Sequence, residues 1–130
     1  MASITLHDQS ATGRELGSIT LDQLPDTITL RELIRLRVRE EVARHNAAPT
    51  TRFQGLIQPT DAEVDRNGYR LRKPRRLDWE KQADVAEAAF LRNGFFVLLD
   101  DRQAEDLDEV IAVDEALEVA FVKLVQLVGG

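Results

Sequence analysis

The segment 117–128, LEVAFVKLVQLV, and the two glycines after it, Gly129 and Gly130, decide how this sequence is interpreted. The segment is rich in β-branched and other apolar residues, which favour a strand. Alternate side chains of a strand point to opposite faces. One face would carry Ala120, Val122 and Leu124, and the other Phe121, Lys123 and Val125. We therefore predict a last strand that leads directly into a diglycine.

Two further strands are expected near the start of the chain. Residues 3–8 and 16–21 alternate apolar and polar side chains, which is the pattern of strands with one face against a core. The stretch between them contains Gly13, which can adopt the left-handed conformation of a tight turn. These features predict a β-hairpin.

A helix is expected to begin after Thr29. Thr29 and Glu32 have the spacing of a capping box, and Ile28 can pack on Leu33 across the first turn. Apolar residues then recur with the 3.6-residue period of a helix, and Pro49 follows its end. We expect this helix to lie across the hairpin.

Residues 47–94 are organised differently, because prolines interrupt them and no period is sustained at first. Asn67-Gly68 is a strong hairpin-turn signal, so residues 62–66 and 69–73 are expected to form a short β-ribbon. A second helix is expected from Asp78, its N-cap, to residues 93–94.

Strands are expected again after the second helix. Residues 95–101, FFVLLDD, form a nearly continuous apolar run, which suits a central strand buried on both faces. Residues 107–113, LDEVIAV, are expected to form a short turn and strand. The order of elements is therefore hairpin, helix, insertion, buried strand, short strand and last strand.

This order resembles ubiquitin and the β-grasp superfamily. Two stretches carry the resemblance, FFVLLDDRQAEDLDEVI at 95–111 and EVAFVKLVQLVGG at 118–130, the second of which is similar to the last strand and diglycine of ubiquitin. Sulfur-carrier proteins of thiamine and molybdopterin synthesis share this ending. The resemblance implies an α+β fold, a mixed sheet with one helix packed across it. It covers residues 3–46 and 95–130 of a single domain, 1–130, and the insertion 47–94 has no counterpart in ubiquitin.

The resemblance also implies a function for Gly129 and Gly130 in a bacterial type of modifier or sulfur carrier. A ubiquitin-activating-like enzyme would adenylate the carboxylate of Gly130, using ATP, and the acyl group would pass to an acceptor protein or a sulfur-transfer enzyme. The protein would be a substrate rather than an enzyme, and it would hold no cofactor or metal of its own. The alternative is an interaction module that is not conjugated and that acts through its sheet or its insertion.

Composition limits the remaining possibilities. The 130 residues include no cysteine, which excludes a disulfide scaffold, a thiolate metal site and a cysteine nucleophile. The sequence contains neither an apolar run long enough to span a membrane nor the pattern of a secretory signal, so we expect a cytoplasmic protein without a membrane partner. The net charge is −6, and nine of the acidic residues lie in residues 96–130. This acidic third could attract a basic activating enzyme.

Two sets of charged residues remain as candidate contacts with a partner. RNGYRLRKPRR, at 66–76, places six basic residues around Tyr69, and Arg72, Arg75 and Arg76 are the candidates within it. The acidic character of the whole chain disfavours nucleic acid and favours docking on an acidic protein or on this protein's own acidic third. On the last strand, Phe121, Lys123 and Val125 could face a partner, although a solvated charge on an edge strand is the simpler interpretation of Lys123.

Overall fold

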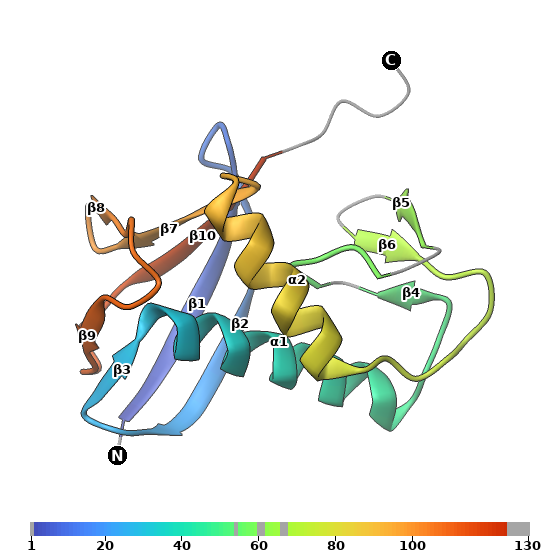
Figure 1. The fold of residues 1–130 in the computed structure, drawn as a ribbon, viewed down its shortest axis with the longest axis horizontal. Coiled ribbons are helices and arrows are strands. Elements are labelled where there is room, and N and C mark those ends of the chain that lie inside the picture. The colour runs from blue at the N-terminus through green and yellow to red at the C-terminus, as the bar shows by residue number, and fades with distance from the viewer. Residues whose placement is uncertain (1, 54, 60–61, 66–67, 125–130) are drawn as a thin grey trace.

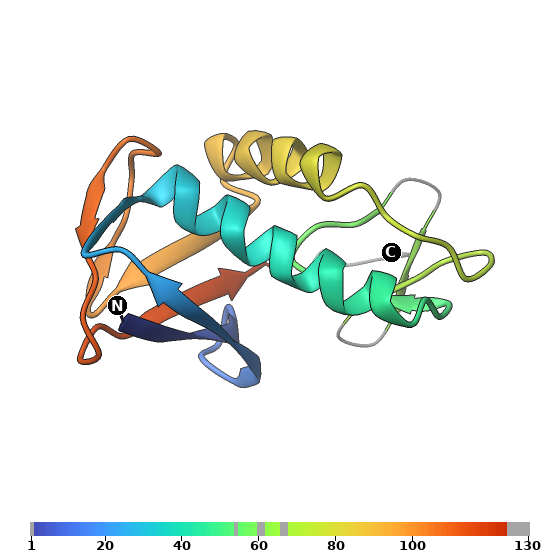
Figure 2. The same cartoon turned by 90° about the horizontal axis from the view of Figure 1, so that it is seen from below.

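The computed structural model describes residues 2–53, 55–59, 62–65 and 68–124. These residues form an α+β fold in which two helices lie against one face of a mixed five-stranded sheet (Figures 1 and 2). Two smaller sheets flank it at opposite ends of the molecule, as Figure 1 shows.

The main sheet has the strand order β2-β1-β10-β7-β8. All neighbouring pairs are antiparallel except β1 and β10, which run parallel, with Leu6 opposite Val119 and Ser10 opposite Lys123. The strand segments are β1 (Ala2–Ser10), β2 (Glu15–Leu24), β7 (Phe95–Leu99), β8 (Arg102–Gln103) and β10 (Val119–Lys123). The strand nearest the end of the chain is thus at the centre of the sheet.

The predicted β1–β2 hairpin is confirmed. Gly13 takes the turn position with a φ of 89°, in the left-handed region that glycine reaches without strain. The inward side chains of the hairpin, which include Ile4, Leu6, Ile19 and Leu21, are buried against the helical layer.

Helix α1 (Leu30–Ala47) begins with the predicted capping box. The hydroxyl of Thr29 accepts a hydrogen bond from the backbone N–H of Glu32 at 3.1 Å, and the Thr29 N–H donates to the Glu32 carboxylate at 3.3 Å. Helix α2 (Trp79–Leu91) begins at Asp78, which accepts hydrogen bonds from the next turn, so the second predicted helix is also confirmed. Helix α2 lies alongside α1 (Figure 2).

The two smaller sheets are built from very short strands. The first pairs β3 (Thr27–Thr29) with β9 (Val110–Ala112). The second, within the insertion, has the order β4-β6-β5, from Arg52–Phe53, Gly68–Arg70 and Glu63–Asp65. The antiparallel pairing of β5 and β6 confirms the predicted ribbon, but Gly68 is the first residue of β6, opposite Asp65, rather than part of the turn. Residues 66–67 lie outside the described part of the chain.

One prediction for strand β7 is wrong. Phe95, Val97 and Leu99 are buried, but Phe96 and Leu98 on the other face are only half-buried. Both described helices pack on the same side of the sheet, so β7 is buried on one face rather than on both. Within the described residues, no helix is long and apolar enough to cross a membrane.

Candidate functional site

A cleft with a volume of about 550 Å³ lies where the main sheet, helix α1 and the inserted segment meet. One wall is formed by residues 16–19 of β2, another by the last turns of α1, and the third by residues 48–53 of the insertion. Asp8 and Lys123 come from the adjacent central strands β1 and β10. The cleft therefore lies beside the end of the last described strand.

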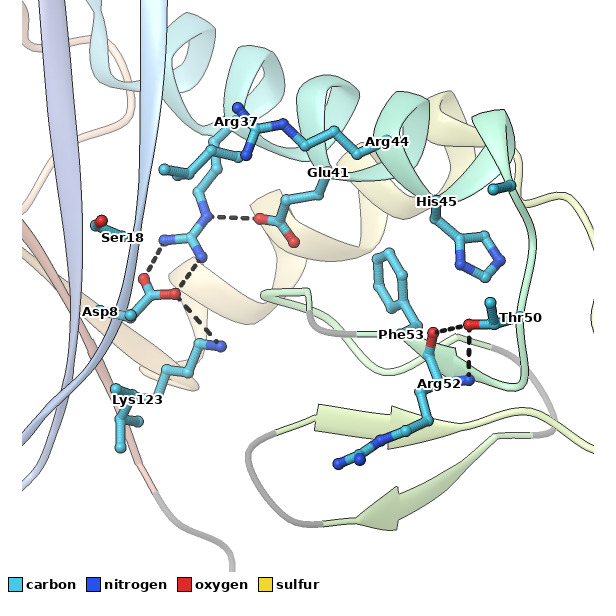
Figure 3. A pocket seen from close by; sticks show the side chains of 14 residues that line it. Asp8, Ser18, Arg37, Glu41, Arg44, His45, Thr50, Arg52, Phe53 and Lys123 are labelled. Atoms are coloured by element: carbon cyan, nitrogen blue, oxygen red, sulfur yellow. Dashed lines mark hydrogen bonds and ion pairs between the residues drawn. The ribbon is translucent and has the colours of Figure 1, made fainter.

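Arg37 is at the centre of a charged network in this cleft, and only 2% of its surface is exposed. Its Nη1 and Nη2 atoms donate to Oδ1 and Oδ2 of Asp8 at 2.5 and 2.6 Å, and its Nε atom donates to Oε1 of Glu41 at 2.5 Å (Figure 3). A paired, planar guanidinium suits this arrangement because it can satisfy two carboxylates at once.

The same network joins the insertion to the sheet. The second carboxylate oxygen of Glu41 accepts the backbone N–H of Leu56 at 2.7 Å. Lys123 donates from Nζ to the carbonyl oxygen of Gly55 at 3.2 Å, and the same Nζ lies 3.7 Å from Oδ2 of Asp8. Charged side chains from β1, α1 and β10 thus hold residues 55–56 in place.

Burial governs the protonation of these groups. It raises the pKa of Glu41, although the charge of Arg37 opposes this change. Burial also lowers the pKa of Lys123, against the attraction of Asp8. For Arg37, burial alone would lower the pKa, but the carboxylates of Glu41 and Asp8 more than offset it and raise the pKa, so this side chain stays charged.

Lys123 and Phe121 do not have the surroundings predicted from the sequence. Strand β10 is paired on both sides, so Lys123 is not an edge-strand charge; its side chain is only 24% exposed and lies beneath the insertion. Phe121 is completely buried, with Arg37 over its ring at 4.5 Å and the ring of Phe95 stacked at 5.9 Å. It is a core residue, and the prediction that it contacts a partner is wrong.

None of the predicted basic residues Arg72, Arg75 and Arg76 lines the cleft. Arg72 and Arg76 are exposed and Arg75 is half-buried. The carbonyl of Arg75 accepts a hydrogen bond at 2.7 Å from Nε2 of His45, which itself lines the cleft. His45 is buried and meets the ring of Phe53 edge-on. Val125, Gly129 and Gly130 lie outside the described residues.

Sequence reasoning missed Asp8, Arg37 and Glu41. A signal for two of them was present, because Arg37 and Glu41 continue the buried positions of α1 that include Leu30, Leu33 and Ile34. Opposite charges four residues apart on the apolar side of a helix indicate a buried ion pair rather than a solvated one.

The cleft combines paired charged side chains with a few apolar ones. Its carboxylates are engaged by cations, and no group of three or more potential metal ligands occurs among the residues that the structure describes. Comparisons with protein-family models, with curated proteins and with solved structures found no match. The proposals that follow therefore rest on the sequence and on this geometry.

Proposed function

We propose that this protein is a β-grasp carrier, a modifier or sulfur carrier whose Gly130 carboxylate is activated by an ATP-dependent, ubiquitin-activating-like enzyme. The observation that supports the proposal is the strand order of the main sheet. A hairpin, a helix across it and a central last strand parallel to the first are the arrangement expected of a β-grasp domain, and here that last strand precedes Gly129-Gly130.

The proposed reaction uses the protein as a substrate. The Gly130 carboxylate attacks the α-phosphate of ATP, and pyrophosphate leaves as an acyl adenylate forms. A thiol, sulfide or amine then attacks the acyl carbon, and AMP leaves. Glycines suit this step because a segment without Cβ atoms can pass through a narrow channel to the enzyme's nucleotide. The proposal requires Gly130 to be the terminal residue of the mature protein.

The test compares N-terminally tagged protein with a matched variant that lacks Gly129 and Gly130, both expressed in the native host. Denaturing gels and intact mass measurements would reveal covalent adducts or a C-terminal thiocarboxylate. We expect these species only with the intact tail, and their masses would distinguish conjugation from sulfur transfer. Identical, unmodified protein from both versions under growth and stress conditions would refute the proposal.

The open face of the sheet supports a second candidate function, an interaction module that is not conjugated. Phe96 is opposite Val122, and Leu98 is opposite Ala120, so four half-buried apolar residues gather on the face away from the helices. A partly exposed apolar cluster on one face of a sheet suits a protein contact.

This candidate predicts that proteins co-purify with the tail-less variant and are lost when Phe96 and Val122 are both changed to Asp. Thr20→Asp on the same face is the control, because the side chain of Thr20 is exposed and already polar. Circular dichroism would establish that each variant is folded. Retention of the same proteins by the F96D/V122D variant would contradict the candidate.

A further inference from the structure

The two edge strands of the main sheet differ in length. An edge strand directs the N–H and C=O groups of alternate residues away from the sheet, where another strand can pair with them. Strand β8 consists of only Arg102–Gln103 and offers little length for such pairing. Strand β2 has ten residues, and among the residues that the structure describes no strand pairs with it on the side away from β1. The sheet therefore has one long edge at which it can be extended.

The sequence of β2 lacks the residues that usually prevent such pairing. Edge strands often carry lysine or proline, or are bent by β-bulges. The strand sequence, ELGSITLDQL, contains neither lysine nor proline. Register shifts occur near both ends of the β1–β2 pair, and Gln23 has a φ of 57°, but Gly17–Leu21 pairs regularly with β1. The centre of β2 thus presents a regular edge.

We propose that β2 pairs in antiparallel orientation with β2 of a second copy of this chain, which joins the two main sheets into one. A two-fold axis at Thr20 places this residue opposite its own copy. On the same exposed face, Ser18 lies opposite Asp22 of the second copy, so its hydroxyl can donate to that carboxylate. On the buried face, Ile19 lies opposite Leu21, and both belong to the core. This register matches polar with polar residues and apolar with apolar ones.

The neighbouring registers match less well. A two-fold axis at Ile19 would place Leu16 opposite Asp22 of the second copy. An axis at Leu21 would place Ile19 opposite Gln23. Each of these registers sets an apolar side chain against a polar one, whereas cross-strand pairs of like character stabilise a sheet. The proposal therefore specifies the register with its axis at Thr20.

The net charge of −6 is compatible with this contact because the acidic residues are concentrated elsewhere. Residues 100–118 contain nine acidic side chains and one basic one, a net charge of −8 against −6 for the whole chain. That segment begins beside β8, four strands away from β2, which is about 19 Å at the usual spacing of about 4.8 Å. This distance exceeds the Debye length of about 8 Å at physiological salt. Within β2, Glu15 lies 2.8 Å from Nδ1 of His7, and Asp22 meets Ser18 rather than another acid.

The contact would also add a wall to the cleft. Ser18 and Ile19 line the cleft, and Asp22 and Leu21 of the second copy would lie directly opposite them. The second copy would thus contribute residues to the cleft of the first. The two-fold axis makes this exchange reciprocal, so the dimer would contain two equivalent clefts.

The test is sedimentation equilibrium of the full chain at about 1 µM to 1 mM, the range in which weak contacts associate. We expect an equilibrium between monomer and dimer. Ser18→Asp places like charges opposite each other at both ends of the contact, so it should weaken the dimer about tenfold. Ser18→Lys places a lysine opposite Asp22 and should strengthen the dimer about threefold. Ser18 is exposed, and circular dichroism would establish that both variants are folded.

The matched controls are Gln103→Asp and Gln103→Lys on β8. They change the net charge by the same amounts at an exposed position of the other edge, so they separate the local contact from general repulsion between copies. They should change the dissociation constant by about twofold or less. The charge-swapped double variant S18D/D22K should recover the affinity of the wild type, because each aspartate again faces a lysine.

Two results of sedimentation equilibrium would overturn the proposal. One is a monomer at every concentration. The other is a dimer that responds to the Ser18 variants no more than to the Gln103 variants, or in the same direction to both charges, which would place the contact elsewhere. Because the test does not involve Gly129-Gly130, its outcome is independent of the carrier proposal.

A crosslinking experiment identifies the occupant of the edge in cells. A photoreactive amino acid in place of Ser18, in protein expressed in the native host, should yield a crosslinked species of twice the mass of the chain. A crosslink to a different protein, with no crosslinked dimer, would instead assign this edge to a strand of another partner and overturn the proposal.

Discussion

Replacing Arg37 with Met should destabilise the protein more than any other single change in the charged network. The substitution keeps a long apolar stem but removes three hydrogen bonds to Asp8 and Glu41. Both carboxylates are largely buried, so each would lose its main compensating charge inside the protein. Breaking a buried ion pair from one side typically costs about 3–5 kcal/mol. A domain of this size is stable by only about 5–15 kcal/mol, so R37M should lose a large part of its free energy of unfolding.

Equilibrium unfolding in urea at pH 7 measures this loss directly. The matched control is R35M, two residues away on the same helix, whose more exposed guanidinium pairs with Asp84 and Glu87. We expect R35M to lose about 1 kcal/mol or less. The deficit of R37M should shrink as the pH falls, because protonation removes the unpaired negative charges.

A second variant tests whether the unpaired carboxylates cause the loss of stability in R37M. Adding Glu41→Gln to R37M removes one of the two stranded charges while leaving an oxygen that can accept the Leu56 N–H. R37M/E41Q should therefore be more stable than R37M alone. The reasoning would be refuted if R37M lost no more stability than R35M, or if the added E41Q substitution made R37M still less stable.

Three further predictions concern single residues. Thr29→Ala removes the capping box and should lower the free energy of unfolding by about 1 kcal/mol in urea titrations. Gly55→Ala should destabilise the protein by about 1–3 kcal/mol in thermal unfolding, because the new Cβ would overlap the Phe53 ring and lie 2.6 Å from Oε2 of Glu41. An unchanged melting temperature would contradict this packing. Burial raises the pKa of Glu41, so the folded state binds the proton of this carboxyl group more tightly than the unfolded state does. The stability that results from this difference is present at acid pH. It is lost as the pH rises through the pKa of Glu41 in the folded state. The free energy of unfolding of the wild type relative to E41Q should thus fall as the pH rises from about 4.5. A rise over the same range would contradict a raised pKa for Glu41.

The elements that could be predicted are those with local signals. The capping box of Thr29 and Glu32, the turn at Gly13 and the β5–β6 ribbon each depend on residues a few positions apart. Strands β3, β4 and β8 were not predicted because two or three residues are too few to establish a period. Their extended conformation depends on pairing with strands that are distant in the sequence or irregularly placed.

The candidate site could not be predicted in the same way because it depends on contacts between distant segments. The sequence around Lys123 predicts an edge strand because it does not reveal that β1 and β7 flank the strand that carries Lys123. Asp8, an ordinary polar residue of an alternating strand, becomes half of an ion pair only when Arg37 crosses above it. Tertiary packing determined the environment of both residues.

The central position of β10 also affects how this protein folds during its synthesis. Leu6 pairs with Val119, so the parallel pair of strands cannot form until β10 has emerged from the ribosome. Pairing across such a long sequence separation is also intrinsically slow. During that interval the hairpin and α1 would expose their apolar sides. A chaperone that acts on nascent chains would therefore have access to these apolar surfaces until β10 emerges.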